Sequence, residues 1–392
     1  AMNGGQPDWG NIRRAAADPT AKFAAGMNLV VDSAGPTTTL TSSVLEKCVQ
    51  PASLHVKLWN QASQHDYHLR PTMFSRVCAP EFSWLPVALA RRAARYAYYL
   101  DDNLWEYRRD NALSAYYSNP AVRQSLALFI RNATIVLVSS PHLANHLRAE
   151  FPKSRVEHVP ASFDFNLLPE RAPHSQQETA PDRPLRVGYA GSERGGAFSA
   201  VVPAIKRTIL NRPGAFEFEF IGHMPEELKD TPGVRHFENI SNYRQFLDFK
   251  QARGWELALA PLEDDAFSRS KTNNKFREYG ALGIPGLYSD VAPYADSVQH
   301  TLSGLLVGHG EEDWTTALEW ALQHRKALPQ MGGRAREHVW SKHRLQVVAP
   351  QWAAVLESAA LTATTAAIGS FEWRTLRLLG KIKGRLPRRS AG

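Results

Sequence analysis

Cysteine and long apolar runs are scarce in this chain of 392 residues. Its two cysteines, Cys48 and Cys78, do not form a CxxC pair, which excludes a disulfide framework and suits a reducing compartment. No uncharged apolar run approaches the ~20 residues needed to cross a bilayer. The first residues also lack the apolar core of a signal peptide. We therefore expect a cytoplasmic protein without a membrane-spanning segment.

The standard fingerprints of phosphate loops and zinc sites are missing as well. There is no GxGxxG, no Gly-Lys-Ser/Thr of a P-loop, no HExxH and no cluster of Cys and His. These absences exclude a standard dinucleotide fingerprint and a P-loop, and they argue against a zinc enzyme. We expect neither a metal ion nor another cofactor.

What the sequence does contain favours a globular protein with an anionic partner. Hydrophobic residues make up 43% of the chain and charged residues 21%, and a chain of this length usually forms two domains. The net charge of +8 favours a nucleotide, a nucleic acid, an acidic glycan or an anionic membrane. Much of the excess lies after Phe371, where Glu372 is accompanied by Arg374, Arg377, Lys381, Lys383, Arg385, Arg388 and Arg389.

A proline-rich, polar segment at residues 169–184 predicts a linker between two domains. On both sides of it, short apolar segments alternate with helical stretches, a rhythm typical of βαβ units. The chain is thus predicted to form two Rossmann-like halves. The predicted strands are 28–31, 55–59, 96–100, 133–138 and 156–160 before the linker, and 185–190, 216–221, 234–237, 255–260 and 286–289 after it.

One stretch of the second half predicts an anion site. Residues 255–260 and 286–289 are predicted to be buried strands, and between them Thr272 is placed to cap a helix. The start of that helix offers unpaired N–H groups and a partial positive charge, and Lys271 and Lys275 add full charges beside it. These features suit a phosphate group.

Two loops that contain glycine follow predicted strands of the second half. The loop GSERGG at residues 191–196 permits a tight turn and a close backbone approach to a phosphate, and Arg194 adds a charge. Gly222 and His223 follow the strand 216–221. Ligands of parallel α/β sheets bind beyond the carboxyl ends of the strands, so both loops are candidate binding elements.

In this order, these motifs resemble the C-terminal, donor-binding domain of glycosyltransferases with the GT-B fold, in particular the family 4-like enzymes. The resemblance covers residues 185–345 and rests on RVGYAGS, FEFIGHMP, ELALAPL, KTNNKFREYGALGIP, YSDVAPY, and GLLV before EEDW. Before the linker, YYLDDNLWE, ATIVLVSSPHLANHL and VEHVPASFDFNLLP look like the second half of the acceptor domain of the same enzymes.

The resemblance implies an α/β fold in which two Rossmann-like domains face a cleft. The implied division is an acceptor domain at 1–168, a linker at 169–184, a nucleotide-sugar donor domain at 185–345, a helical return to the first domain at 346–370 and a basic amphipathic tail at 371–392. The implied activity is transfer of a hexosyl or deoxyhexosyl group from a nucleotide-sugar to a glycan or lipid-linked acceptor, in surface polysaccharide biosynthesis.

The resemblance also names the residues expected at the donor. In retaining relatives, two Glu residues separated by seven positions face the donor. Glu278 takes the second place here, whereas Ser270 stands at the first, so the contact to the sugar hydroxyls departs from the family pattern. The expected donor-binding residues are Gly191, Ser192, Arg194, Gly195, Gly222, His223, Lys271, Thr272, Lys275 and Glu278.

Lys275 and Glu278 stand three residues apart, so both can face one ligand from the same side of a helix; the alternative is an ordinary ion pair on a solvated face. Metal-dependent transferases of the other common fold place an Asp-x-Asp at a strand end, and this sequence has none. The cluster 263–265 is instead expected to be a loop or a helix cap. We expect metal-independent transfer, with Arg194, Lys271, Lys275 and the helix dipole stabilising the leaving diphosphate.

Asp101 and Asp102 follow the predicted strand 96–100, at the expected cleft, and are the candidate catalytic residues. A carboxylate there can activate an acceptor hydroxyl if the reaction inverts. The alternative is that Asp102 or Asn103 caps the next turn. Residues 65–68, His-Asp-Tyr-His, also hold acid and base groups, but in a loop where such residues are common at the surface.

The tail at 371–392 has a basic amphipathic pattern if it is helical. Phe371, Leu378, Leu379 and Ile382 then gather on one side and basic residues on another. Such a helix would dock on an anionic membrane and bring the enzyme to a lipid-linked acceptor at the inner face of the cell membrane. The alternative is a helix that packs back on the protein.

Two other functions fit the same sequence. A nucleotide-sugar 2-epimerase shares this architecture and would use the same phosphate site. A protein that binds nucleic acid or another polyanion would explain the charge of +8. We expect no nucleic-acid partner, because the basic residues concentrate in the tail and no nucleic-acid-binding module is recognisable.

Overall fold

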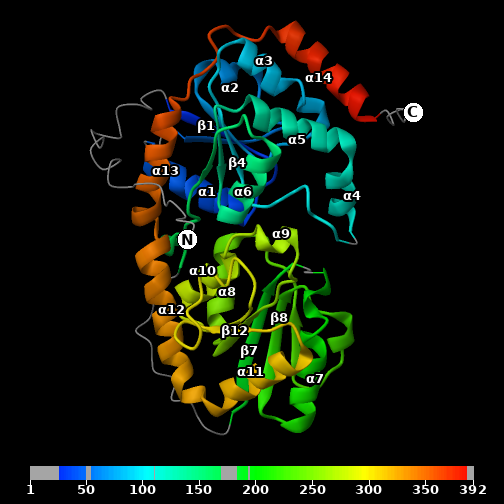
Figure 1. Ribbon diagram of the computed structural model, residues 1–392, viewed down its shortest axis with the longest axis vertical. Helices are drawn as coiled ribbons and strands as arrows, with labels where there is room; N and C mark the ends of the chain where they lie inside the picture. Colours follow the sequence, from blue (N-terminus) through cyan, green and yellow to red (C-terminus); the bar gives the residue numbers. More distant parts are fainter. Residues whose placement is uncertain (1–25, 50–53, 110, 169–182, 193–194, 386–392) are drawn as a thin grey trace, which may run out of the picture.

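The computed structural model describes residues 26–49, 54–109, 111–168, 183–192 and 195–385. Within them the chain forms two parallel sheets of six strands each, one on each side of the predicted linker (Figure 1). The predicted α/β architecture of two Rossmann-like domains is confirmed. Outside the described residues lie most of the predicted linker, Arg194 and the end of the predicted tail.

The first sheet has the strand order β2-β1-β3-β4-β5-β6. Its inner strands β1, β3, β4 and β5 are buried along their whole length, as expected for a parallel sheet with helices on both faces. The sequence patterns do not predict β3, which has four residues and no clear apolar periodicity. The elements are β1 (Met27–Val31), α1 (Pro36–Cys48), β2 (Leu54–Leu58), α2 (Gln64–Leu69), β3 (Thr72–Ser75), η4 (Pro80–Phe82), α3 (Leu85–Arg91), β4 (Ala97–Leu100), α4 (Ala112–Ser118), α5 (Pro120–Asn132), β5 (Ile135–Val138), α6 (Pro141–Glu150), β6 (Val156–His158) and η5 (Phe165–Leu167).

The second sheet has the order β12-β11-β10-β7-β8-β9, with its first strand in the interior. Between β7 and β10 the direction of winding reverses, and the same happens between β1 and β3 in the first sheet. Such switch points are where parallel α/β sheets bind ligands. The elements are β7 (Leu185–Gly191), η6 (Gly195–Phe198), α7 (Val201–Asn211), β8 (Phe216–Gly222), η7 (Glu226–Leu228), β9 (Val234–Phe237), α8 (Tyr243–Ala252), β10 (Leu257–Ala260), α9 (Ala266–Arg269), α10 (Asn274–Leu282), β11 (Gly286–Ser289), β12 (Leu305–Val307), α11 (Glu311–Gln323), η8 (Arg325–Ala327) and α12 (Leu328–His343).

Two C-terminal helices return to the first half. Figure 1 shows α12 and α13 (Leu345–Ala359) along one side of the molecule, rising from the second half to the first. Trp352 of α13 is buried in the core that Leu29, Val44 and Tyr99 also share. The last helix, α14 (Ser370–Arg385), lies against η4 at the far end of the first half. None of the described helices combines the length and apolarity that a bilayer crossing requires.

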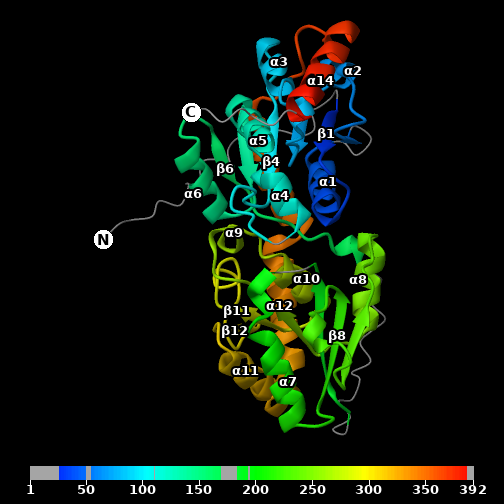
Figure 2. The same cartoon turned by 90° about the vertical axis from the view of Figure 1, so that its right-hand side faces the viewer.

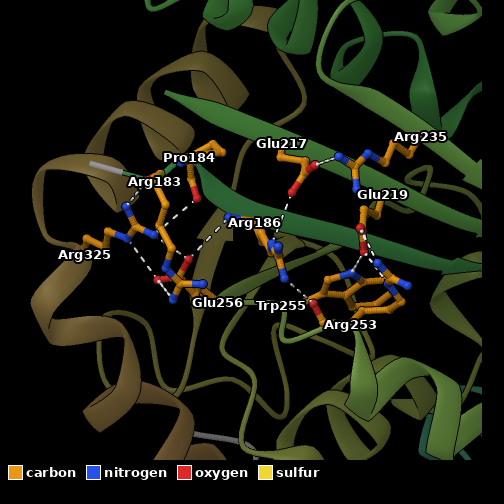
Figure 3. Close-up of polar contacts among 10 residues, drawn as sticks. All are labelled: Arg183, Pro184, Arg186, Glu217, Glu219, Arg235, Arg253, Trp255, Glu256 and Arg325. Atoms are coloured by element: carbon orange, nitrogen blue, oxygen red, sulfur yellow. Dashed lines mark hydrogen bonds and ion pairs between the residues drawn. The ribbon is translucent and has the colours of Figure 1, made fainter. Parts of the chain in front are cut away.

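A network of ion pairs lies at the amino-terminal ends of β7 and β8 (Figure 3). Glu219, fully buried, accepts two hydrogen bonds from Arg253 at 3.0 and 3.1 Å. Arg325 donates to both carboxylate oxygens of Glu256, at 2.9 and 2.7 Å, and to the carbonyl of Arg183 at 2.7 Å. The network therefore fixes the start of β7 to the junction of α11 and α12, at the opposite ends of the strands from those that face the first half.

Candidate active site

A cavity of about 250 Å³ lies between the two halves. Its lining comes from α1 and the residues after β3 and β4 in the first half, and from the residue after β7 and the start of α10 in the second. Both switch points therefore open on it, as the topology predicts. Six of the residues expected at the site line it: Asp101, Asp102, Ser192, Lys271, Thr272 and Lys275.

Cations outnumber carboxylates in this lining. Lys271 donates to Asp102 Oδ1 at 2.9 Å, which joins the second half to the first across the cavity. The Arg76 guanidinium lies 3.3 Å from Asp101 and 3.6 Å from Asp102. The cationic side chains are Arg76, Lys271, Lys275 and Arg277, against the two carboxylates. This excess of positive charge suits an anion, and at the start of α10 the helix N–H groups add to it.

Asp101 is held by a hydroxyl as well as by Arg76. Thr37, in the first turn of α1, donates to Asp101 Oδ2 at 2.6 Å. The carboxylate of Asp102 faces Arg76 and Lys271. Among the described residues it does not cap the turn that follows β4, which is the alternative that the sequence offers. Both aspartates are thus fixed in the cavity wall by hydrogen bonds and ion pairs.

Lys275 enters the cavity wall beside Gly191. Its Nζ donates to the carbonyl of Ala190 and lies 5.2 Å from the ring centre of Tyr189. A Cβ on Gly191 would stand 2.7 Å from that Nζ, so a larger residue would push the ammonium group away. The sequence indicates a close backbone approach at Gly191; the group that approaches it here is Lys275.

Glu278 does not line the cavity, and its carboxylate bonds to other protein groups. Lys250 donates to Oε2 at 2.8 Å, and Tyr243 donates to Oε1 at 3.0 Å. The side chain of Lys250 is 0% exposed and that of Glu278 3%. Burial alone would raise the pKa of Glu278, but the ammonium groups of Lys250 and Lys275 lower it to about 2. Lys275 and Glu278 are both buried, so an ion pair on a solvated face is excluded. In this structure the carboxylate of Glu278 faces Lys250 and Tyr243, and its contact with one ligand together with Lys275 stays a prediction.

Asn274 connects Glu278 to the cavity. It lines the cavity, and its Nδ2 donates to Glu278 Oε1 at 3.1 Å. Because an ionised carboxylate only accepts hydrogen bonds, the amide nitrogen must face Glu278 and the amide oxygen must point elsewhere. That oxygen is buried and has no partner among the residues that the structure describes. Glu278 thus orients Asn274 and leaves it an acceptor for a hydroxyl or N–H group.

The predicted cap of α10 is wrong by one residue. Asn273 takes the N-cap position, without a side-chain capping bond. The hydroxyl of Thr272 accepts instead from Arg277, at 3.2 Å. Arg277 is buried and also donates to the carbonyl of Ser162 in the first half, so the start of α10 is fixed from both sides of the cavity.

Four of the predicted loop residues stand behind the cavity and not in its lining. His223 donates its backbone N–H to the carbonyl of Gly191 at 2.8 Å, next to Gly222. Gly195 begins η6 and packs against Arg109 of the first half. These glycines shape the loops that hold Ser192. Arg194 lies outside the described residues.

Ser270, at the position where the family pattern has its first Glu, is buried and bonded within the protein. It lies at the end of α9, where its hydroxyl donates to the carbonyl of Ala266 at 2.8 Å.

Asp265 caps α9 by accepting a hydrogen bond from the N–H of Ser268, as expected for a cap. Asp66, in the group 65–68, closes a capping box on α2 and accepts from Lys57 at 2.5 Å. Each of these residues has a structural role.

Sequence reasoning missed Arg76, Thr37 and Asp32 on the first half. A second hollow of about 170 Å³ adjoins the cavity and shares Thr37 and Arg76 with it. It is also lined by Asp32, whose pKa is raised by burial against the opposing effect of Arg76. Asp32 directly follows β1, so the rule that sites follow strand ends, applied to every strand, would have found it.

No group of three or more His, Cys, Asp or Glu side chains that could hold a metal ion occurs within the described residues. The polar side chains of the cavity lining are cations, hydroxyls, two carboxylates and the amide of Asn274.

Comparisons with known proteins place the fold. No family model matches the chain, and a search of curated proteins finds no match either. Among solved structures, Anabaena HepE in complex with UDP and glucose superposes with a TM-score of 0.60 at 12% identity, over 85% of this chain and 100% of that one. The sucrose-phosphate synthase of Thermosynechococcus elongatus gives 0.61 at 15% identity, over 85% and 98%. A glycosyltransferase from Rickettsia africae gives 0.59 at 12% identity, over 85% and 98%. The architecture they share with this chain, two α/β domains that each have a parallel sheet, is the GT-B fold.

Proposed function

We propose that this protein is a glycosyltransferase, similar to family 4 enzymes, that moves a hexosyl or deoxyhexosyl group from a nucleotide-sugar to an acceptor. The observation that carries the proposal is the excess of cations around the cavity at the start of α10, with Asp101 and Asp102 on the opposite wall. A diphosphate fits the cationic side, and an acceptor hydroxyl fits the carboxylate side.

The neighbouring structures support a nucleoside diphosphate as part of the donor. The HepE structure contains UDP and glucose, and another contains UDP-glucose. Because this chain has the same fold and a cationic cavity at its own switch points, UDP is the first nucleotide to test here.

The proposed reaction breaks the bond between the anomeric carbon and the diphosphate oxygen and forms one to an acceptor oxygen. Lys271, Lys275 and Arg277 stabilise the negative charge that develops on the leaving diphosphate. The acceptor proton passes to Asp101 or Asp102 if the reaction inverts. We propose that three cations and the N–H groups of α10 suffice for this step without a metal ion.

We propose a glycan or a lipid-linked sugar of surface polysaccharide biosynthesis as the acceptor. The second hollow beside the cavity supports a polar acceptor, since Ser33, Thr38 and Asp32 line it. The proposed location is the cytoplasm, with a lipid-linked acceptor reached at the inner face of the membrane. The basic, partly apolar outer side of α14 supports this location.

Thermal unfolding with UDP, GDP, dTDP and CMP tests the donor. A ligand that binds only the folded state raises its melting temperature by mass action. We expect one of the diphosphates to do so, with the same shift after treatment with EDTA. Absence of a shift with all four nucleotides would contradict a nucleotide-sugar donor, and a shift that EDTA abolishes would contradict the metal-free site.

A nucleotide-sugar 2-epimerase is the second candidate. A putative UDP-N-acetylglucosamine 2-epimerase from Listeria monocytogenes superposes with a TM-score of 0.50 at 12% identity, over 85% of this chain and 96% of that one. Incubation with UDP-N-acetylglucosamine and no acceptor separates the two functions, because only an epimerase converts the donor alone. We expect no conversion.

A further inference from the structure

The outer side of α14 joins exposed apolar side chains to basic ones. Phe371 is 83% exposed, Leu378 59% and Ile382 47%. At ~100° per residue these three side chains fall within about 40° of one another around the helix. Arg374 and Lys381, also exposed, lie roughly 60° to 80° from Phe371 on one flank. We call these five residues the outer face of α14.

The opposite side of α14 attaches the helix to the first half. Trp373 is buried, with its ring centre 5.2 Å from that of Trp84 and 5.8 Å from that of Tyr67. A Cβ on Gly380 would stand 2.3 Å from the backbone oxygen of Glu81, so the helix contacts η4 at backbone distance. Figures 1 and 2 both show α14 along the end of the first half. The helix packs on the protein by one side and leaves the outer face exposed.

The charges around the outer face favour an anionic partner. Glu372, the acidic residue of α14, accepts two hydrogen bonds from Arg92, at 2.8 and 2.7 Å. Its charge is therefore balanced, and Arg374 and Lys381 set the sign of the surface. The sequence beyond Ile382 adds further basic residues and no acidic one.

The shape of the outer face fits a lipid surface better than a protein groove. Its apolar side chains form one strip along a helix, bordered by long cationic side chains on a flank. Cationic side chains of this kind can keep their charge at the phosphates while apolar neighbours enter the acyl boundary. An apolar strip exposed at a fixed orientation marks an interaction surface in a protein.

We infer that α14 docks this protein on an anionic lipid bilayer, with Phe371, Leu378 and Ile382 inserted and Arg374 and Lys381 at the phosphates. The outer face lies on the first half, the proposed acceptor domain, so the docked protein would hold that half at the membrane. The docking does not depend on sugar transfer, and its test is independent of the donor test.

Co-sedimentation of the full chain with vesicles tests the docking. We expect binding to phosphatidylcholine mixed with phosphatidylglycerol, no binding to phosphatidylcholine alone, and weakening of binding by salt. Joint replacement Phe371→Ser, Leu378→Ser and Ile382→Ser should reduce binding by about tenfold or more. Joint replacement Arg374→Gln and Lys381→Gln should reduce it by about tenfold.

Leu210→Ser is the matched control, because Leu210 is 79% exposed on α7 of the second half. This variant should bind vesicles as the unmodified protein does. Circular dichroism melting and UDP binding should be the same in all variants, which separates the docking from folding and from the donor site.

Three outcomes would overturn the inference. The unmodified protein sediments with neither vesicle, or equally with both, or the triple variant binds as well as the unmodified protein. A dimer in solution that the triple replacement dissolves, without any vesicle binding, would identify a second copy of the chain as the partner instead.

Discussion

The two halves each form a parallel sheet of six strands, with different strand orders, and they contribute different charged groups to the cavity. In each sheet the first strand lies in the interior, and a switch point beside it opens on the cavity. The first half supplies both carboxylates, Asp101 and Asp102, together with one cation, Arg76. The second half supplies three cations, Lys271, Lys275 and Arg277, and no carboxylate of the lining. One fold can carry both sets because the residues that face the ligand sit in loops and at helix starts, outside the sheets.

The halves also differ in how the site residues are distributed along the chain. In the second half the cations lie within seven consecutive positions, 271–277, at the start of one helix. In the first half Thr37, Arg76 and Asp101 follow three different strands. We therefore expect the second half to determine donor binding and the first half to determine transfer.

Replacing a carboxylate of the first half should have the largest effect. If the reaction inverts and Asp101 accepts the proton, Asp101→Asn lowers kcat by about 10²–10⁴-fold, the usual contribution of a general base. UDP affinity should stay nearly unchanged, because the diphosphate contacts belong to the second half. Steady-state kinetics and calorimetry measure the two quantities. Asp230→Asn, an exposed position, is the control; equal loss of UDP affinity and turnover would break the division between the halves.

Glu278→Ala should destabilise the second half by about 3–5 kcal/mol, because it leaves the ammonium of Lys250 buried without its carboxylate. Urea unfolding measures the change. The joint replacement Lys250→Met and Glu278→Leu removes both charges and should recover much of the loss. Glu226→Ala, which breaks the exposed pair with Lys229, should change stability little. An unchanged Glu278→Ala protein with weak UDP binding would show a direct ligand contact instead.

His343 makes the junction between the halves sensitive to acid. It faces the carbonyl of Ala161 at 2.9 Å, and burial, with Arg277 nearby, lowers its pKa to about 4. In the unfolded chain the imidazole of His343 takes up a proton near pH 6.5, whereas in the folded protein it does so only near pH 4. The free energy of unfolding is therefore highest above about pH 6.5 and decreases as the pH falls towards 4, by up to ~3 kcal/mol.

His343→Asn keeps an N–H donor for Ala161 and should flatten that slope. Urea unfolding at several pH values between about 4.5 and 7.5 measures it. His324→Asn, at an exposed position, should keep the slope. The same slope in all three proteins would show that another group carries the acid sensitivity.

Lys275→Ala should weaken UDP binding by about 10- to 100-fold, the effect of losing one charged hydrogen bond. Turnover at saturating donor should fall less. Lys326→Ala, on the exposed side of η8, is the matched control and should bind UDP normally. Unchanged UDP affinity of the Lys275→Ala protein would place the diphosphate elsewhere in the cavity. It would also contradict the expectation that the second half determines donor binding.

Most strands and the two-domain division could be predicted because buried parallel strands read as short apolar runs. β3 could not be predicted, because only its two middle residues are apolar and Thr72 and Ser75 flank them. Its place in the centre of the sheet comes from pairing with β1 and β4. Arg76, at the end of this strand, was therefore missed. Lys271 and Lys275 were found because a helix start concentrates phosphate-binding features within a few residues.

The sequence by itself determined the local features: the strands, the glycine loops, the helix from 274 to 282 and its cations, and the amphipathic pattern of the tail. Only the tertiary structure decided their partners. Glu278 bonds to Lys250, which is 28 positions away, and Lys271 to Asp102, which is 169 away. Such contacts follow from strand order and from how two domains meet. Local propensity does not encode either, because both depend on burying whole faces of sheets and helices against each other.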